Sequence, residues 1–322
     1  MEAVILSGGF GTRLRPLTYT RPKPLLPIAN KPMVQHILDR LPDEVDRAVL
    51  ASGYKVEEIR AWAETLDHRV ELVVIDEEEP LGTGGAIKNV EDEITGEFLC
   101  FNGDVLSSLD LDRLVATRRE HDAMGALALW EVDEPEHFGV VAMDGPKITD
   151  FVEKPDPGQA PTNLINAGTY CFSQDILDHI PAGRKVSIER EIYPKLIEEG
   201  YDLIGLPFQG WWVDCGRPEV YLQAHEILLD GTLEAGPGAT MDGAWEGWAC
   251  LGANAKVASG ATLTRSILLD GAKVEAGATL VDTIVGEGAT VGKDARLTGC
   301  VVGDGEHVPA GRELNQERIG GE

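Results

Sequence analysis

The residues most able to do chemistry lie near the N-terminus, in a segment rich in glycine and basic side chains. A short apolar run at residues 3–6 leads into the glycine-rich residues 8–11, and Arg13 and Lys23 follow. Glycines lack a Cβ and let backbone N–H groups approach phosphate oxygens closely. Arg13 adds a planar charged fork for phosphate, and Lys23, held between two prolines, adds a fixed point charge. The pattern predicts a site for a phosphate-rich ligand.

The spacing of these glycines excludes two common phosphate-binding motifs. It matches neither G-x-G-x-x-G, the dinucleotide fingerprint, nor G-x-x-x-x-G-K-[ST], the P-loop. The longer pattern instead resembles the signature loop of the sugar-1-phosphate nucleotidyltransferases. The matching residues are Gly8-Gly9-x-Gly11-Thr12-Arg13-Leu14-x-Pro16-Leu17-Thr18 and Pro22-Lys23-Pro24.

Further segments resemble this family in its own order along the chain. They are a nucleobase and ribose loop at residues 81–86, a metal-binding strand end at 101–104, sugar-contacting segments at 138–141, 151–155 and 166–168, and a second metal segment at 212–216. The resemblance implies transfer of a nucleotidyl group from a nucleoside triphosphate to a hexose 1-phosphate, with release of pyrophosphate.

The resemblance also assigns roles to individual residues. It implies nucleotide binding by Gly8, Gly9, Gly11, Thr12, Arg13, Lys23, Glu79, Gly82 and Thr83. It implies sugar-phosphate binding by Gly139, Glu153, Lys154 and Asn166. It implies that Asp104 and Asp214 hold Mg²⁺.

The chemistry of the implied reaction agrees with these residue types. Two polyanions must meet for an in-line attack on the α-phosphorus, so positioning and charge neutralisation dominate. We expect Arg13 at the leaving β- and γ-phosphates, Lys23 at the α-phosphate and Lys154 at the sugar 1-phosphate. With the metal ligand Asp104, these three are the predicted catalytic residues. The attacking phosphate is already ionised, so no general base is needed.

The elements that position these residues are read from hydrophobic periodicity. Buried-strand runs at residues 3–6, 48–51, 70–75 and 98–101 alternate with helical patterns near 32–41, 56–66 and 82–91. Such alternation predicts an α/β domain with a Rossmann-like, mainly parallel sheet over residues 1–232. Residues 8–9 and 102–104 both follow predicted strands, at the carboxyl ends where such sheets bind ligands.

Beyond residue 233 the sequence becomes periodic. Apolar residues recur every 17 positions in three series: Val257, Val274, Val291 and Val308; Leu263, Leu280 and Leu297; Leu268, Val285 and Val302. Their spacings of 6, 5 and 6 place one apolar residue on each face of a triangular coil. This resembles a left-handed parallel β-helix of hexapeptide repeats, predicted over 233–322 with a short C-terminal tail.

Composition narrows the class of protein. The net charge is −27, which disfavours nucleic-acid binding. No apolar run is long enough to span a membrane, the N-terminus lacks a signal-peptide pattern, and the five cysteines form no metal motif. We therefore expect a cytoplasmic enzyme that binds no membrane and has reduced thiols. The acid excess suggests the hypothesis of a high-salt cytoplasm, and the open end of a β-helix predicts a homo-oligomer.

The nucleotide and the sugar are predicted from three sequence segments that resemble one branch of the family. Residues 77–83, 187–194 and 209–214 resemble the mannose-1-phosphate guanylyltransferase branch, so GTP and mannose 1-phosphate are the expected pair. Glucose-1-phosphate thymidylyl- and uridylyltransferases share the signature loop and stay as alternatives. So does a non-catalytic regulatory relative that binds nucleotide sugar.

Several polar side chains have plainer interpretations. His36 and His137 are expected in packing or at the surface, and Arg15 and Lys31 are equally compatible with phosphate contacts and surface charge. His307 lies in the predicted β-helix, where a catalytic histidine would indicate an additional acyltransferase. A lone histidine there is more often a loop residue.

Overall fold

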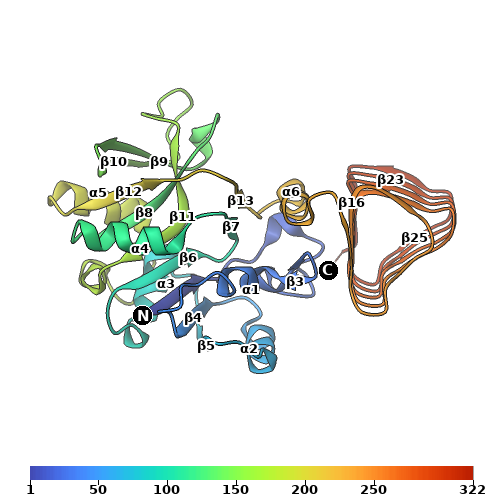
Figure 1. The fold of residues 1–322 in the computed structure, drawn as a ribbon, viewed down its shortest axis with the longest axis horizontal. Coiled ribbons are helices and arrows are strands. Elements are labelled where there is room, and N and C mark those ends of the chain that lie inside the picture. The colour runs from blue at the N-terminus through green and yellow to red at the C-terminus, as the bar shows by residue number, and fades with distance from the viewer. Residues whose placement is uncertain (322) are drawn as a thin grey trace. The chain divides into compact units, whose positions relative to one another are not determined.

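The structure, a computed structural model, describes residues 1–321. Contacts between residues group the chain into two compact units (Figure 1). The first unit comprises residues 1–9 and 37–212, and the second comprises residues 10–36 and the chain from Val213 onward. Within residues 1–321, no helix is both long enough and apolar enough to cross a membrane.

A nine-stranded sheet forms the centre of the first unit, in the order β5-β4-β1-β6-β11-β8-β12-β10-β9. Only β10 and β11 run against the others, so seven of the nine strands point the same way. The strands are β1 (Glu2–Leu6), β4 (Arg47–Ser52), β5 (Glu71–Asp76), β6 (Phe98–Asn102), β8 (Gly125–Glu131), β9 (Gly139–Asp144), β10 (Lys147–Glu153), β11 (Leu164–Phe172) and β12 (Leu203–Pro207). The mainly parallel sheet predicted from the sequence is confirmed.

The four predicted strands lie side by side, and β1, β4 and β6 are buried almost throughout, whereas the edge strand β5 is half-buried. Val4 and Ile5 point to opposite faces of β1 and both are fully buried, as a sheet covered on both faces requires. The three predicted helical patterns are also present, as α1, α2 and α3. The α-helices are α1 (Met33–Leu38), α2 (Val56–Thr65), α3 (Gly82–Asn89), α4 (Leu111–Glu120), α5 (Tyr193–Glu198) and α6 (Pro218–Leu229).

Short elements join these strands and helices. The 3₁₀ turns are η1 (Thr12–Leu14), η2 (Lys23–Leu25), η3 (Glu91–Glu93), η4 (Pro135–His137) and η5 (Gln174–His179), and η6 (Ile188–Ile192) is a π-helical turn. Four short strands lie outside the nine-stranded sheet and the β-helix: β2 (Pro27–Ile28), β3 (Lys31–Pro32), β7 (Val105–Ser107) and β13 (Trp212–Asp214).

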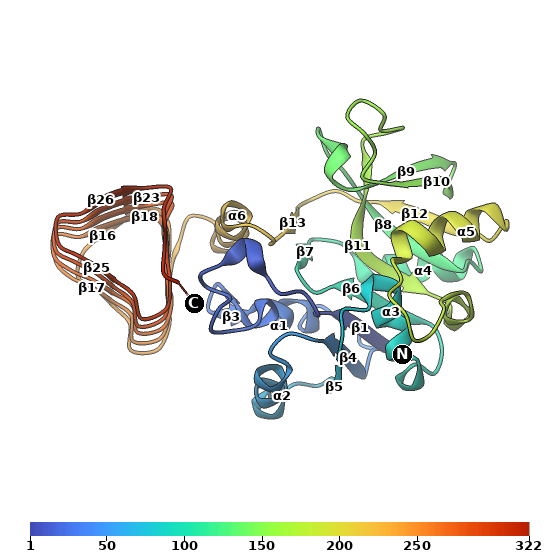
Figure 2. The same cartoon turned by 180° about the vertical axis from the view of Figure 1, so that it is seen from behind.

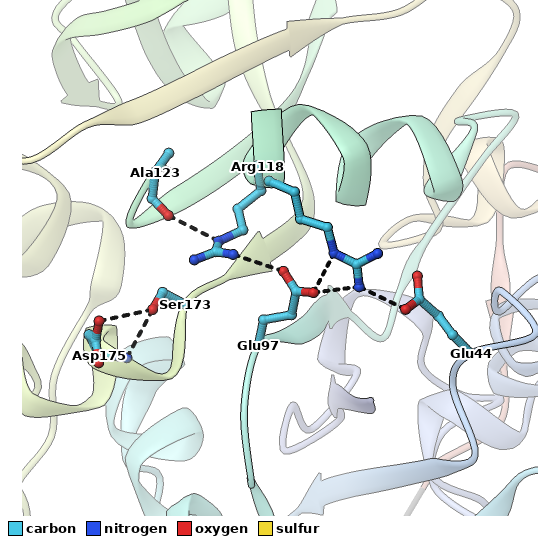
Figure 3. Close-up of polar contacts among 7 residues, drawn as sticks. Glu44, Glu97, Arg118, Ala123, Ser173 and Asp175 are labelled. Carbon is cyan, nitrogen blue, oxygen red and sulfur yellow. Dashed lines mark hydrogen bonds and ion pairs between the residues drawn. The ribbon is translucent and has the colours of Figure 1, made fainter. Parts of the chain in front are cut away.

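An ion-pair network stabilises the amino end of β6 (Figure 3). Glu97, directly before β6, forms ion pairs with Arg118 at 3.0 Å and with Arg119 at 2.5 Å. Arg119 also pairs with Glu44 at 2.7 Å. Arg118 further donates to the carbonyl of Ala123. Glu97 precedes β6 and residues 102–104 end it, so this network lies at the opposite edge of the sheet from the predicted ligand site. Its role is structural.

The second unit contains a parallel β-helix, whose stacked coils have a triangular outline (Figures 1 and 2). The strand ladders pair residues 17 positions apart, as in Val257 with Val274 and Leu280 with Leu297. Its strands are β14 (Leu233–Ala235), β15 (Thr240–Met241), β16 (Ala244–Leu251), β17 (Lys256–Val257), β18 (Thr262–Leu268), β19 (Lys273–Val274), β20 (Thr279–Val281), β21 (Ile284–Val285), β22 (Thr290–Val291), β23 (Arg296–Thr298), β24 (Val301–Val302), β25 (His307–Val308), β26 (Glu313–Asn315) and β27 (Arg318–Ile319).

The predicted periodic residues form the core of this β-helix. Val291, Leu280 and Val302 are fully buried, and each comes from a different one of the three series. Cys300 joins them, and all five cysteines are buried and outside any disulfide bond. Helix α6 packs against β16 and β18 within the same unit.

Candidate active site

The carboxyl edge of the parallel strands brings the first group of predicted residues together. Gly8 and Gly9 follow β1, and Asn102 ends β6, the parallel neighbour of β1. The backbone N–H of Gly103 donates to the carbonyl of Leu6 at 2.9 Å. A Cβ on Gly103 would lie 2.7 Å from that same oxygen, so the turn after β6 requires glycine.

Glu77 lies directly against the start of the glycine-rich loop. It follows β5, it is 7% exposed, and its Oε1 accepts the backbone N–H of Leu81 at 2.7 Å. A Cβ on Gly8 would lie 2.2 Å from its Oε2. Burial raises the pKa of the Glu77 carboxyl above its usual range, and the hydrogen bond from Leu81 partly opposes this. The loop therefore lies beside an acid held in a poorly solvated place.

The nearby acids have different environments. Glu78 and Glu79 are exposed, whereas Glu77 is buried. Sequence reasoning selected Glu79 from this run, and its nucleotide contact stays a prediction. The structure adds Glu77 as a candidate, which three consecutive glutamates could not reveal.

The predicted nucleobase loop forms the start of α3. The Thr83 hydroxyl donates to Glu189 Oε2 at 2.6 Å and accepts the backbone N–H of Ile188 at 3.0 Å. The N–H groups of Gly84 and Gly85 both donate to the carbonyl of Val186. These contacts fix the first turn of α3 against residues 186–189.

The glycines of this loop have a packing role. Gly82 has φ +71°, and a Cβ there would lie 2.6 Å from the Val186 carbonyl oxygen. A Cβ on Gly84 would approach the side chain of Val186 to 3.0 Å. The close approach of α3 to residues 185–188 explains these glycines, and Gly82 and Thr83 stay predicted nucleotide contacts.

Three of the predicted sugar-phosphate residues lie at the open end of the β9–β10 hairpin, where Gly139 pairs with Glu153. A Cβ on Gly139 would lie 2.9 Å from Glu153 Oε2, so the carboxylate lies over this glycine. Lys154 follows in the left-handed region with φ 53°. Its ammonium group lies 3.3 Å from Glu153 and its side chain is 58% exposed. Lys154 thus presents its charge to solvent, whereas the paired Glu153 side chain is only 17% exposed.

Asn166 is oriented by its own strand. Its Nδ2 donates to the Tyr170 hydroxyl at 2.8 Å, and its Oδ1 accepts the backbone N–H of Gly168 at 3.1 Å. A Cβ on Gly168 would lie 2.7 Å from Nδ2 of Asn102. Asn166 and Asn102 therefore both lie beside Gly168, near the carboxyl end of β6.

In the second unit, the signature loop continues through Gly11 and η1. Gly11 has φ +61°, and its carbonyl accepts the Thr18 hydroxyl at 2.9 Å. This bond closes the loop and leaves Thr12 and Arg13 exposed. Exposed basic and hydroxyl groups on a closed loop are suited to contacting phosphate.

Arg13 and Asp214 lie together around Gly216. A Cβ on Gly216 would lie 2.4 Å from Arg13 Nη2 and 3.0 Å from Asp214 Oδ1. The glycine at this position leaves room for the guanidinium group. Asp214 is half-buried at the end of β13.

Lys23 is buried at 7% exposure between Pro22 and Pro24. The backbone N–H of Leu25 donates to Pro22 and that of Leu26 donates to Lys23, which makes the turn η2. The backbone of this lysine is therefore held in place, as the sequence predicted from the flanking prolines.

The other polar candidates have structural or surface positions. His36 hydrogen-bonds the carbonyl of Ile28 at 2.8 Å, and His137 is exposed. His307 is exposed on β25. The guanidinium group of Arg15 lies 4.9 Å from the Tyr19 ring centroid.

The carboxylates predicted to hold a divalent metal do not form a ready-made cluster of protein ligands. Among residues 1–321, no group of three or more His, Cys, Asp or Glu side chains forms a metal cage. Asp104 and Asp214, the predicted metal ligands, are both half-buried. A donor set of one or two carboxylates fits Mg²⁺, which keeps several waters and completes its shell with substrate phosphates.

Comparison with known proteins covers both parts of the chain. Residues 2–231 match the nucleotidyl transferase family, and residues 227–320 match the GMPPB C-terminal domain. Mannose-1-phosphate guanylyltransferase of Mycobacterium tuberculosis is 35% identical, over 84% of this chain and 80% of the relative. The catalytic subunit beta of that enzyme from Danio rerio is 38% identical, over 74% of this chain and 69% of the relative.

A solved structure is also similar to this chain. HddC from Yersinia pseudotuberculosis, in complex with GMP-PN, has a TM-score of 0.59 and 31% identity, and the match covers 70% of this chain and 99% of that one. The family match spans well over half of the chain and agrees with the loop geometry described above. The chain therefore belongs to the nucleotidyl transferase family and is a sugar-1-phosphate nucleotidyltransferase.

Proposed function

We propose that this enzyme transfers a guanylyl group from GTP to mannose 1-phosphate, giving GDP-mannose and pyrophosphate. The observation that carries the proposal is the 35% identity with a mannose-1-phosphate guanylyltransferase over 84% of the chain. The GMPPB C-terminal match supports it from the other part of the sequence. Thymidylyl and uridylyl transfer are the alternatives within the same reaction class.

Glu77 is the residue we propose for base selection. Guanine presents N1–H and N2–H₂ donors on one edge, and a carboxylate accepts both. Uracil and thymine present a single donor between two acceptors. Because Glu77 is buried beside Gly8, an unpaired acceptor there would be poorly solvated. Such a mismatch costs about 1–3 kcal/mol, which is roughly a tenfold to a hundredfold loss of kcat/KM.

The proposed roles of the basic residues follow from charge. Arg13 is exposed on the closed signature loop, where it can contact the β- and γ-phosphates that leave. Lys23 neutralises the α-phosphate, and Lys154 holds the sugar 1-phosphate. Charge neutralisation and in-line alignment supply the rate enhancement, because the attacking oxygen needs no deprotonation.

The remaining contacts are proposed in two sets. Backbone N–H groups of Gly8, Gly9 and Gly11 bind phosphate, with Thr12, Glu79, Gly82 and Thr83 completing the nucleotide site. Glu153 and Asn166 hydrogen-bond sugar hydroxyls, and Gly139 allows the sugar to approach.

Nucleotidyltransferases of this family generally use a divalent metal. We propose Mg²⁺ for this enzyme, held by Asp104 and Asp214. When bound, it would neutralise charge on the triphosphate.

We also propose that the β-helix supports a homo-oligomer. Among the described strands, β25, β26 and β27 end their ladders, so the last coil has a paired neighbour on one side only. Such an open end is usually covered by a partner or a cap. Light scattering of a chain ending at residue 232, compared with the full chain, tests the assignment.

The domain boundary near residue 232 is itself a proposal, supported by family matches that overlap at residues 227–231. The cytoplasmic location likewise stays a proposal.

A pyrophosphate-release assay over a grid of nucleoside triphosphates and sugar 1-phosphates tests the proposed pair. We expect the highest kcat/KM for GTP with mannose 1-phosphate. A preference for UTP or dTTP with glucose 1-phosphate would overturn the pair and keep the reaction class. Nucleotide-sugar binding without turnover would instead support a regulatory relative.

A further inference from the structure

Much of the signature loop lies in a segment that contacts the C-terminal part of the second unit. We call residues 10–36 the signature arm, and it belongs to the same compact unit as the β-helix. Hydrogen bonds and ion pairs join the arm to the C-terminal elements. They run from Arg318 to the carbonyl of Arg15, from Thr20 and Arg21 to Asp304, from Arg21 to Glu287, from Asn30 to the carbonyl of Leu251, and from Tyr221 to the carbonyl of Pro27.

Asp304 makes the most concentrated of these contacts. Its Oδ2 accepts from Arg21 Nη2 at 3.0 Å and from the Thr20 hydroxyl. Arg21 also pairs with Glu287 at 2.5 Å. The side chains of Arg21 and Asp304 are only 20% and 11% exposed, so solvent screens this pair less than a surface pair.

The second oxygen of Asp304 has an ordinary function within the β-helix. Oδ1 accepts the backbone N–H of Glu287 at 2.7 Å, and Glu287 lies at the equivalent position one coil earlier. Asp270 makes the same bond in an earlier coil, where its Oδ1 accepts the N–H of Ala253 at 2.8 Å. Both bonds join residues 17 positions apart. The contact of Oδ2 with the arm thus distinguishes Asp304 from Asp270.

The chain between Arg21 and the phosphate-binding lysine has little freedom. Pro22 follows Arg21 directly, with φ −70°, and Pro24 follows Lys23. A proline ring fixes its own φ and restricts the residue before it. Lys23 is itself buried. A displacement of Arg21 therefore moves the backbone of Lys23.

We infer that Asp304, in the β-helix, is a positioning residue for nucleotidyl transfer, because it holds Arg21 and through it fixes Lys23 in the nucleotide site. The inference depends on the proposed role of Lys23 at the α-phosphate. It gives the β-helix a part in catalysis besides stability and assembly.

The charge state of Arg21 agrees with this assignment. Burial lowers the pKa of its guanidinium group, but Asp304 and Glu287 outweigh that effect and raise the pKa above its ordinary value. Arg21 therefore stays charged, and the loss of one carboxylate would leave a half-buried cation with a weakened partner.

The test compares Asp304→Asn with Asp270→Asn. Asparagine keeps an oxygen for the backbone bond in both coils, and in Asp304→Asn it places an amide N–H₂ toward Arg21. We expect Asp304→Asn to lower kcat/KM for the nucleoside triphosphate about tenfold, since small displacements of a catalytic group have large effects on rate. The KM for sugar 1-phosphate should change less than about twofold. Asp270→Asn should keep wild-type kinetics.

Two further measurements separate positioning from stability. Asp304→Glu should restore part of the lost kcat/KM, and Arg21→Gln combined with Asp304→Asn should lose little more than either alone. Equal losses of thermal stability and activity in Asp304→Asn and Asp270→Asn would overturn the inference, as would wild-type kinetics in Asp304→Asn.

The outcome is distinguishable from failure of the proposed function. If the wild-type enzyme prefers another triphosphate, the comparison is made with that triphosphate and keeps its meaning. If the wild-type protein binds GTP without turnover, calorimetric Kd values decide, and Asp304→Asn should bind GTP about tenfold more weakly than Asp270→Asn. Equal Kd values for these two variants would contradict the inference.

Discussion

The carboxylate of Glu77 occupies the space that a side chain at residue 8 would need. A Cβ on Gly8 would lie 2.2 Å from Glu77 Oε2, a separation that two unbonded atoms do not reach. Gly8, which the sequence predicts to contact phosphate, therefore also leaves room for the buried acid that follows β5. The nucleotide loop and the acid beside it depend on one another.

Gly8→Ala should weaken nucleotide binding by displacing Glu77. We expect about a tenfold increase in the Kd for GTP, which is about 1.4 kcal/mol, with a stability loss of about 1 kcal/mol. Calorimetry and thermal unfolding measure the two effects. Gly96→Ala is the control, since a Cβ at Gly96 would meet nothing within 4 Å. An unchanged Kd in Gly8→Ala would show that Glu77 does not shape the site.

Glu77→Gln should change how stability depends on pH. Burial raises the pKa of the folded carboxyl above its usual value of 4.5. The folded state then holds the proton more tightly than the unfolded chain, so this contribution is fully present below the unfolded pKa and is lost as pH rises through the folded pKa. Glutamine keeps an acceptor for the N–H of Leu81 and removes the charge.

The variant should therefore become more stable relative to wild type as pH rises from about 5 to about 8. Thermal unfolding of both proteins at matched pH values measures the difference. Glu78→Gln, at the exposed neighbouring residue, is the control and should show a smaller trend. A stability difference that does not vary with pH would contradict the raised pKa.

Asp104→Asn and Asp214→Asn should each nearly abolish turnover while the fold survives. Either change removes a charged ligand for the proposed Mg²⁺, and a loss of several kcal/mol corresponds to at least about a hundredfold in kcat. Steady-state kinetics with Mg²⁺ and circular dichroism measure activity and fold. Asp112→Asn, in the first turn of α4, controls for the general effect of this substitution. Wild-type turnover in either variant would remove that residue from the metal site.

Lys154→Ala should weaken binding of sugar 1-phosphate and leave triphosphate binding largely intact. Its side chain is 58% exposed beside Glu153, away from the signature loop in the sequence. We expect an increase of about tenfold in the sugar-phosphate Kd. Lys147→Ala is a matched control, because Lys147 lies at the start of β10, its side chain is 46% exposed and it also pairs with a carboxylate, that of Asp202. Equal losses for both ligands would assign Lys154 to the triphosphate.

Much of the fold was predictable because it is periodic or local. Residues 3–6 of β1 are apolar throughout, and residues 17 apart pair in the β-helix as their spacing predicted. The turn at Gly103 follows its strand directly, so its place at the carboxyl edge could also be predicted.

The rest depended on contacts that leave no local pattern. Glu77, Glu78 and Glu79 are the same residue type, and only the path of the chain after β5 decides which of them is buried. The pairing of Arg21 with Asp304 joins residues 283 positions apart and follows no repeat. A sequence division near residue 232 could not show that residues 10–36 share their contacts with the β-helix.

Competition kinetics test the central claim most directly. GTP, UTP, dTTP and ATP are offered at equal concentrations with mannose 1-phosphate or glucose 1-phosphate, and each nucleotide sugar is quantified. We predict that GDP-mannose is the main product, with kcat/KM for GTP at least about tenfold above each other triphosphate. A main product of UDP- or dTDP-glucose would contradict the proposed pair, and the absence of any nucleotide sugar or pyrophosphate would contradict catalysis by this chain.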